Sequence, residues 1–287
     1  MDKDIRQLVE MSLMEHGRAV HRWKALVTSA RQEQSDIWIG FHGHQPMAVV
    51  KRHHHASKAR HEWITYDRLQ GPLSAWLPPR YGFIEHVSPL LLLAWQPPWT
   101  DTSDVYPTRD AYEHGSFLRA LHAVEHQDTD QMSPRDALHL RFSRVRAATP
   151  SLCTHVVERV ASLLAMGTAG SRVFCHRDFT ARNWRRKPTS GGLCVIDWGQ
   201  ARADVAASDF VHLVPAWLGR PDAYTQFIEG YGRAFDSGEV AWILGVMGLH
   251  GMASVAWGER HNSAVAYRDG LASLEYLANH PYDDRFL

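Results

Sequence analysis

A short stretch in the second half of the chain contains the side chains best suited to chemistry. The run His176-Arg177-Asp178 is followed by Asn183, and an apolar run of four residues then ends in Asp197. Transfer of a phosphoryl group from a nucleotide needs one carboxylate to orient the attacking hydroxyl, and an amide and a second carboxylate to hold Mg²⁺. Asp178 is therefore the candidate catalytic base, and Asn183 and Asp197 are the candidate metal ligands.

The spacing between Asn183 and Asp197 predicts a hairpin. Two strand-like runs, residues 183–186 and 193–196, flank the segment 187–192, which is rich in Pro, Ser and Gly. Such a hairpin brings Asn183 and Asp197 to the same end of the two strands. Two oxygen ligands at one place are what a hard cation bridging phosphates requires.

Two charged residues far upstream complete the set of residues expected in a nucleotide site. Lys51 ends an apolar run, and Glu62 follows eleven residues later in a segment with helical spacing. In a nucleotide site such a lysine contacts the α- and β-phosphates, and the glutamate pairs with it and fixes its direction. The alternative is a pair of solvated surface charges, but the downstream residues favour the nucleotide site.

The loop from Ser29 to Ser35 lies where a phosphate-binding loop is expected. It contains no glycine, so the usual glycine-rich signal is absent. Backbone amides or the hydroxyls of Ser29 and Ser35 would then bind the phosphates. A plain hairpin loop remains the alternative.

The elements that must position these residues fall into two parts. In the first part, residues 1–17 and 56–69 have apolar side chains at helical spacing. Short alternating runs separated by turns predict strands, and the first three of them form an antiparallel meander. These runs are 23–28, 36–41, 47–51, 81–87 and 90–95.

Helical patterns dominate after a proline-marked connector that begins at residue 96. The predicted helices are 109–125, 134–147, 151–167, 205–218, 222–235 and, with breaks, 239–279. We therefore expect a nucleotide-binding lobe over residues 1–95 and a helical lobe with the catalytic and substrate-binding site over residues 96–287. A ligand is expected in the cleft between the lobes.

Composition narrows the classes of partner. Lys and Arg total 31, as do Asp and Glu, so the chain has no net positive charge that would favour binding to nucleic acid or to an anionic membrane. The N-terminus lacks an apolar signal core, and no apolar run in the sequence approaches membrane-spanning length, which favours a cytoplasmic protein. The three cysteines are expected to be reduced, buried thiols. The run His53-His54-His55 is expected on a surface turn, with a zinc site as the less favoured alternative.

Taken together, these residues resemble the aminoglycoside phosphotransferase and choline kinase group within the protein-kinase-like fold. The resemblance covers about residues 20–280, and His176, Asp178, Asn183 and the run Ile196-Asp197-Trp198 carry it. A further acidic residue, Asp209, and a leucine-histidine pair at Leu121-His122 also fit the group. By residue pattern alone, Asp209 is either the N-cap of a helix or an architectural residue, and the latter is favoured. The resemblance implies an α+β, bilobal fold with a small antiparallel-sheet N-lobe and a larger, mainly helical C-lobe.

The chain also departs from the group. Arg177 replaces a glycine that is common in antibiotic kinases, which makes the loop similar to that of eukaryotic-type protein kinases. Between Asp197 and Asp209 there is no A-P-E segment and no long activation loop. This disfavours a protein kinase and favours a small-molecule acceptor.

The resemblance implies an ATP-dependent O-phosphotransferase that uses Mg²⁺, with GTP as an alternative nucleotide. The adenine is expected against the connector, where the backbone of Ala94 and Gln96 can read its edge. The acceptor is expected to be a small hydroxylated molecule, in particular an antibiotic such as an aminoglycoside, in resistance or self-resistance. Two alternatives stay open: a metabolic kinase of a sugar, nucleoside or amino alcohol, and a non-catalytic nucleotide-binding regulatory module. The oligomeric state is left open.

The sequence motifs say least about which residues bind the acceptor substrate. The candidates are Arg182, Asp204, Trp257 and Glu259. A polycationic aminoglycoside would need clustered carboxylates, for which the chain offers Asp204, Asp236, Glu239, Glu259, Asp283 and Asp284. Aromatic and basic residues share these helices and suit a sugar, nucleoside or peptide antibiotic equally well, namely Trp217, Trp242, Trp257, Arg260 and His261.

Overall fold

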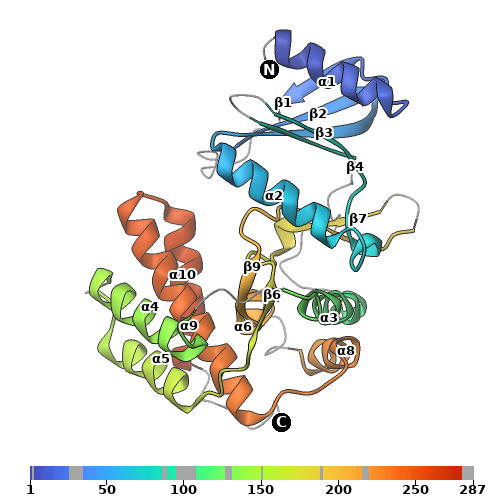
Figure 1. The fold of residues 1–287 in the computed structure, drawn as a ribbon. Helices are drawn as coiled ribbons and strands as arrows, with labels where there is room; N and C mark the ends of the chain where they lie inside the picture. The colour runs from blue at the N-terminus through green and yellow to red at the C-terminus, as the bar shows by residue number, and fades with distance from the viewer. Residues whose placement is uncertain are drawn as a thin grey trace. The chain divides into compact units, whose positions relative to one another are not determined.

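The chain forms a strand-rich part followed by a mainly helical part (Figure 1). The computed structural model describes residues 1, 3–25, 35–85, 89–94, 108–126, 131–149, 151–187, 190–214 and 220–279. The chain divides into two compact units. Unit 1 comprises Met1–Thr102 together with Ala181–Ala201, and unit 2 comprises Ser103–Thr180 together with Arg202–Leu287. The lobe boundary near residue 96 lies outside the described residues and stays a prediction.

Unit 1 is built on an antiparallel sheet with the strand order β1-β2-β3-β5-β4. The first three strands pair in chain order, as expected for the predicted meander. The strands are β1 (Arg22–Ala25), β2 (Ser35–His42), β3 (Gln45–His53), β4 (Arg80–Ile84) and β5 (Leu90–Ala94). The other elements of this unit are α1 (Lys3–Glu15), α2 (Ala56–Leu69), the short 3-10 helix η2 (Ser74–Trp76), η3 (Ala181–Asn183), β7 (Trp184–Arg186) and β8 (Leu193–Val195).

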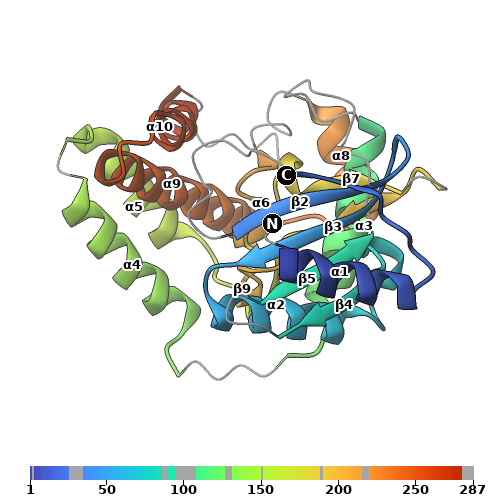
Figure 2. The same cartoon turned by 90° about the horizontal axis from the view of Figure 1, so that it is seen from above.

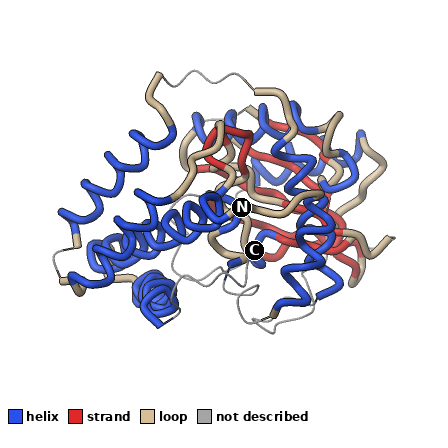
Figure 3. The backbone as a smooth tube through the Cα atoms, turned by 90° about the horizontal axis from the view of Figure 1, so that it is seen from below, coloured by secondary structure: helices blue, strands red, loops and turns tan. Residues whose placement is uncertain are grey.

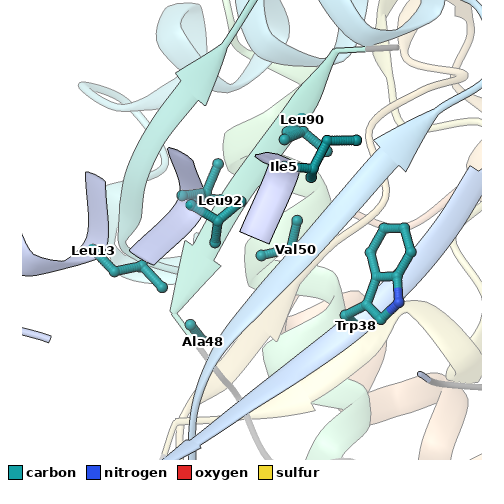
Figure 4. Packing of buried hydrophobic residues seen from close by; sticks show 8 residues of the cluster. Ile5, Leu13, Trp38, Ala48, Val50, Leu90 and Leu92 are labelled. Carbon is teal, nitrogen blue, oxygen red and sulfur yellow. The ribbon is translucent and has the colours of Figure 1, made fainter. Parts of the chain in front are cut away.

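A small hydrophobic core lies between α1 and the sheet (Figure 4). Ile5, Val9 and Leu13 recur every four residues and so share one face of α1. They pack on side chains that alternate along the strands and therefore share one face of the sheet. These side chains are Trp38, Ala48, Val50, Leu90 and Leu92. Because each buried side chain of this size contributes about 1.5–3 kcal/mol, the core fixes β3 and with it the position of Lys51.

In its described residues, unit 2 consists mostly of helices, with one two-stranded sheet. Helices α4, α5, α9 and α10 pack together, as Figure 2 shows. The helices are α3 (Thr108–His122), α4 (Pro134–Ala148), α5 (Thr154–Met166), α6 (Ala207–Phe210), α8 (Pro221–Tyr231), α9 (Ser237–Arg260) and α10 (Ala264–Asn279). The sheet pairs β6 (Arg172–Cys175) with β9 (Arg202–Val205) in antiparallel register.

Two glycines permit a close crossing of α3 and α8. A Cβ atom on Gly115 would clash with the carbonyl oxygen of Phe227, and one on Gly230 would clash with that of Tyr112. No larger residue therefore fits at either position without moving a backbone. The crossing holds α3 in place, and α3 in turn packs against β6, the strand that precedes Asp178.

Helix α9 is apolar on all sides, which is typical of a helix in a protein interior. Among the described residues it is the one helix long and apolar enough to cross a membrane, a property that the sequence pattern alone did not reveal. Yet 72% of its apolar window is buried inside the protein. The helix begins with a capping box in which Asp236 and Glu239 each accept a backbone N–H of the other residue.

Most predicted elements are present within a few residues of their expected bounds. Figure 3 shows the helices in blue and the strands in red. The predicted helix over residues 205–218 is correct only in part. Ala207–Phe210 is helical, but Val205 belongs to β9, and residues 211–213 form a turn. Residues 215–218 lie outside the described part of the chain, so the prediction stays open there. The pairing of β6 with β9 was not predicted. Its strands are four residues each and lie 26 residues apart in the chain, so no local turn signals it.

Candidate active site

Lys51, Glu62 and Asp197 form a compact ionic cluster in unit 1. The Lys51 Nζ lies 2.7 Å from Glu62 Oε2 and 2.8 Å from Asp197 Oδ1. The three residues come from β3, from α2 and from the segment after β8. The Glu62 side chain is completely buried, that of Lys51 is 11% exposed, and that of Asp197 is 47% exposed. The accessible carboxylate is thus the one predicted to bind a metal.

The charges in this cluster stabilise one another. Burial on its own would lower the pKa of Lys51, but the carboxylates of Asp197 and Glu62 outweigh burial and raise that pKa above its usual range. Burial would likewise raise the pKa of Glu62, but the charge of Lys51 and the contact with His53 hold that pKa below its ordinary value. Lys51 and Glu62 are therefore both charged at neutral pH.

The predicted hairpin brings Asn183 and Asp197 to the same end. Strands β7 and β8 are antiparallel, with Trp184 opposite Val195, and the Ile196 N–H donates to the Asn183 carbonyl oxygen at 3.0 Å. Asn183 is the last residue of η3 and is buried. An amide oxygen and a partly exposed carboxylate suit a hard cation such as Mg²⁺, so the donor set fits the predicted metal.

Asp197 adopts a backbone conformation that is uncommon for a residue with a side chain, with a φ of 67°. Aspartate tolerates this left-handed region better than most residues. The next residue, Trp198, is fully buried, and its Nε1 donates to the Val195 carbonyl oxygen at 3.2 Å. Its ring meets that of Tyr66 on α2 edge to face. The indole therefore anchors the segment, while the turn at Asp197 directs the carboxylate toward Lys51.

A histidine on α2 ties this helix to the same segment. The ring of His61, next to Glu62, lies with Nε2 2.7 Å from the Ala201 carbonyl oxygen. A carbonyl can only accept, so Nε2 is the donor. Helix α2 thus contacts this segment at Trp198 through Tyr66 and at Ala201 through His61.

In unit 2, Asp178 lies on a loop that a buried carboxylate holds. Oδ2 of Asp209 accepts the His176 backbone N–H at 3.0 Å, and Oδ1 accepts that of Arg177 at 2.6 Å. The Nε2 of His122 lies 3.1 Å from the same Oδ2. The interpretation of Asp209 as an N-cap is wrong, since Ala206 occupies that position and Asp209 lies within the helix. The architectural interpretation agrees with these contacts.

Several further contacts fix this loop. The Arg177 Nε donates to Asp204 Oδ2 at 2.6 Å, and the Asp178 N–H donates to His176 Nδ1 at 3.3 Å. The ring of Phe179 stacks on Phe117 of α3, with centroids 5.2 Å apart. Burial raises the pKa of Asp209, but the His122 contact and the backbone N–H groups outweigh burial and hold that pKa below its ordinary value.

The remaining predicted site residues have varied surroundings. Ser35 begins β2 opposite His53, and Ala94 ends β5. Arg182 is exposed on η3. Several residues fall outside the described part of the chain, namely Ser29, Gln96, Trp217, Asp283 and Asp284. Their predicted roles, and those of the other site residues, stay predictions.

Three of the acidic residues expected to attract a cationic acceptor, all in the described part of the chain, are engaged within the protein. Asp204 binds Arg177, and Glu259 accepts a hydrogen bond from Ser151 Oγ at 3.1 Å. Glu239 caps α9 and pairs with Arg233 at 2.6 Å. Trp257, near Glu259, stacks on His261 with centroids 4.4 Å apart.

Sequence reasoning missed His53. A surface turn is the expectation for all three adjacent histidines, which holds for His54 and His55 but is wrong for His53, whose side chain is 4% exposed. His53 is the last residue of β3, and its Nε2 lies 3.0 Å from Glu62 Oε2. The signal was present, because residues two apart on a strand share a face, and Lys51 is two residues earlier.

The cysteines also differ from expectation in one respect. Cys175 and Cys194 are buried, as predicted, but Cys153 is exposed. Burial raises the pKa of Cys194 to about 12 and that of Cys175 well above its usual range, so both are neutral thiols. The Cys175 Sγ lies 3.4 Å from the Val205 carbonyl oxygen and contributes to the packing between β6 and β9.

Comparison with known proteins now identifies the class. The profile of the phosphotransferase enzyme family matches residues 41–243, which is most of the chain. The chain belongs to this family, and the enzyme class predicted from the sequence, a phosphotransferase with an alcohol group as acceptor, is confirmed. A comparison with curated proteins gives no significant match.

Solved structures share the fold over almost the whole chain. The GDP complex of aminoglycoside 2'-phosphotransferase-IIIa has a TM-score of 0.70 at 14% identity, and the match covers 97% of this chain and 99% of that one. Macrolide 2'-phosphotransferase from Brachybacterium faecium has a TM-score of 0.66 at 18% identity, with 96% and 99% covered. Spectinomycin phosphotransferase with ADP and spectinomycin has a TM-score of 0.63 at 14% identity, with 97% and 95% covered. The predicted α+β, protein-kinase-like fold is confirmed.

Proposed function

We propose that this protein transfers the γ-phosphoryl group of ATP or GTP to a hydroxyl of a small molecule, and that this molecule is an antibiotic. We place the activity in the cytoplasm, in resistance or self-resistance. The observation that carries the proposal is the Lys51–Glu62 ion pair at 2.7 Å, with Asp197 Oδ1 on the same ammonium. A lysine held between a buried and an accessible carboxylate is poised to bind phosphate beside a metal.

Each residue has a definite task under this proposal. Lys51 binds the α- and β-phosphates, and Glu62 keeps its ammonium charged and directed. Asn183 and Asp197 would hold Mg²⁺, which would neutralise charge on the phosphates. Asp178 accepts the proton of the acceptor hydroxyl. Because the transition state is loose, positioning and charge neutralisation provide most of the rate enhancement.

The nucleotide and acceptor classes draw support from the structural relatives. Relatives with this fold are complexes with GDP or ADP, and with kanamycin or spectinomycin. Another relative is a macrolide phosphotransferase. These acceptors differ in charge and shape, so the fold suits several antibiotic classes. The engaged carboxylates of this chain favour an acceptor that is not recognised mainly by its positive charge.

The test is a transfer assay with radiolabelled ATP and, separately, GTP. Purified protein is incubated with Mg²⁺ and a panel of aminoglycosides, spectinomycin, macrolides and common hydroxylated metabolites. We expect label to move to one antibiotic class and to be lost in the Asp178→Asn variant. Label on a sugar, nucleoside or amino alcohol instead would make the protein a metabolic kinase. Failure to bind either nucleotide would refute the enzymatic proposal.

Expression in a sensitive bacterium provides a second, independent test. We expect the wild-type gene to protect the cells against the antibiotic that is phosphorylated in vitro. The Asp178→Asn gene, expressed at the same level, should not protect them. Equal protection by both genes would show that binding, rather than phosphorylation, is responsible.

A further inference from the structure

The buried carboxylate of Glu62 has more negative charge around it than Lys51 alone can neutralise. A single ammonium serves both Glu62 and Asp197, at 2.7 and 2.8 Å. When the phosphates of a nucleotide bind, Lys51 must serve those as well. Glu62 then needs a second positively polarised group if it is to stay ionised in its buried position.

His53 is the side chain placed to provide that group. Its ring comes from the same face of β3 as Lys51, and its Nε2 lies 3.0 Å from Glu62 Oε2. Both side chains are almost fully buried, so water does not screen the contact. The backbone of His53 is itself fixed, because its N–H donates to the Pro89 carbonyl oxygen at 3.1 Å.

Two buried polar atoms at this contact are not well paired. Within the described part of the chain, the His53 Nε2 and the Glu62 Oε1 both lack a hydrogen-bond partner of good geometry, although both atoms are buried. Buried donors and acceptors are normally paired. A small rotation of the carboxylate would let Lys51 keep one oxygen while His53 donates to the other. With its proton on Nε2, the His53 ring would be the donor that this acceptor lacks.

We propose that His53 is a positioning residue that holds the Glu62 carboxylate ionised and directed at Lys51 while Lys51 binds the nucleotide phosphates. The inference rests on the proposed function, because it concerns the same phosphate-binding lysine. His53 acts through Glu62 and does not contact the reacting atoms.

The first test compares His53→Leu with His53→Gln, and uses His55→Leu as a matched control. His55 is two residues away, exposed, and makes no side-chain cap on α2. Binding of Mg·ATP and Mg·GTP is measured by calorimetry. We expect His53→Leu to weaken binding by roughly tenfold, as for residues that orient a ligating group. His53→Gln, which keeps an N–H donor, should retain more of the affinity, and His55→Leu should bind like wild type.

The second test separates positioning from a merely structural role. His53→Leu is combined with Glu62→Gln in a double-mutant cycle, and thermal unfolding is recorded for each variant. If His53 acts through Glu62, the leucine substitution should cost little affinity once Glu62 is an amide. The same loss in both backgrounds would overturn the inference.

The outcomes also distinguish this inference from the proposed function. Wild-type protein that binds a nucleotide, together with a folded His53→Leu variant that binds it equally well, would refute the role of His53 alone. If His53→Leu does not fold, the same comparison is made with His53→Gln in both backgrounds. Wild-type protein that binds neither nucleotide would refute the proposed function, and the role of His53 with it.

Discussion

The Oδ1 atom of Asp209 accepts the backbone N–H of Arg177 at 2.6 Å, and the φ angle of Arg177 is 65°. A side-chain-bearing residue in this left-handed region costs free energy, roughly 1–3 kcal/mol. The buried carboxylate offsets that cost by binding the N–H groups of both Arg177 and His176. Glycine adopts the same conformation without strain.

We expect Asp209→Asn to destabilise the protein by roughly 2–3 kcal/mol, because a neutral amide replaces a carboxylate in buried, charge-assisted hydrogen bonds. Denaturant unfolding measures this loss. Asp269→Asn is the matched control, since Asp269 is exposed on α10. Equal stability of the two variants would contradict the role assigned to Asp209.

The low pKa of Asp209 has a consequence for acid stability. A carboxyl whose pKa is lower in the folded than in the unfolded state stabilises the protein above its ordinary pKa of 3.8. That contribution declines as the pH falls below this value toward the folded pKa. We expect the free energy of unfolding to fall below about pH 4 more steeply in wild type than in Asp209→Asn. Parallel profiles would exclude Asp209 as a source of the acid sensitivity.

For the catalytic base, we expect Asp178→Asn to lower kcat by roughly 10²–10⁴-fold, the range for losing a positioned proton acceptor. Nucleotide affinity should change little, because the phosphate and metal ligands are other residues. Steady-state kinetics and calorimetry on the same preparation separate the two effects. Near-normal turnover would remove Asp178 from the mechanism.

For the metal, we expect Asp197→Ala to abolish the part of nucleotide affinity that depends on Mg²⁺, because the cation loses its anionic ligand. Nucleotide titrations with Mg²⁺ and with a chelator measure this part directly. In wild type the two titrations should differ, and in the variant they should coincide. A persistent Mg²⁺ effect in Asp197→Ala would mean that other residues hold the ion.

The acceptor should respond little to salt. The Debye length falls from about 10 Å at 0.1 M to about 3 Å at 1 M ionic strength, which screens exposed charges. Since Asp204, Glu239 and Glu259 already have partners, we expect the KM of the acceptor to change little over this range. A steep rise in KM with salt would instead indicate a polycation attracted by acidic residues. A nucleotide titration at each salt concentration serves as the control.

Sequence patterns predicted the parts of the site that are formed by residues close together in the chain. The β7–β8 hairpin follows from a turn between two short strand-like runs. The pairing of Lys51 with Glu62 follows from a strand and the helix after it. Contacts distant in sequence could not be predicted in this way. Asp209 lies 33 residues from His176. The pairing of β6 with β9 helps to bring the two segments together. For the same reason Asp209 had the appearance of a local cap.

His53 shows a different limit of sequence reasoning. The run His53-His54-His55 was interpreted as a surface turn or a zinc site because it consists of three histidines. The alternation of side chains along the strand predicts instead that His53 shares a face with Lys51. Because the side chains of β3 alternate between its two faces, His53 turns inward with Lys51 and contacts Glu62. The sequence pattern predicted a strand that ends at Lys51, so it did not show that the strand extends to His53.

The burial of two of the three cysteines makes the protein suitable for site-selective labelling. Maleimides react with exposed thiolates, so Cys175 and Cys194, which are buried and neutral, should be spared in the folded state. Cys153, exposed just before α5, then provides an attachment point for one fluorophore without mutation. Release of further thiols to the reagent would in turn report unfolding of the sheets that contain them.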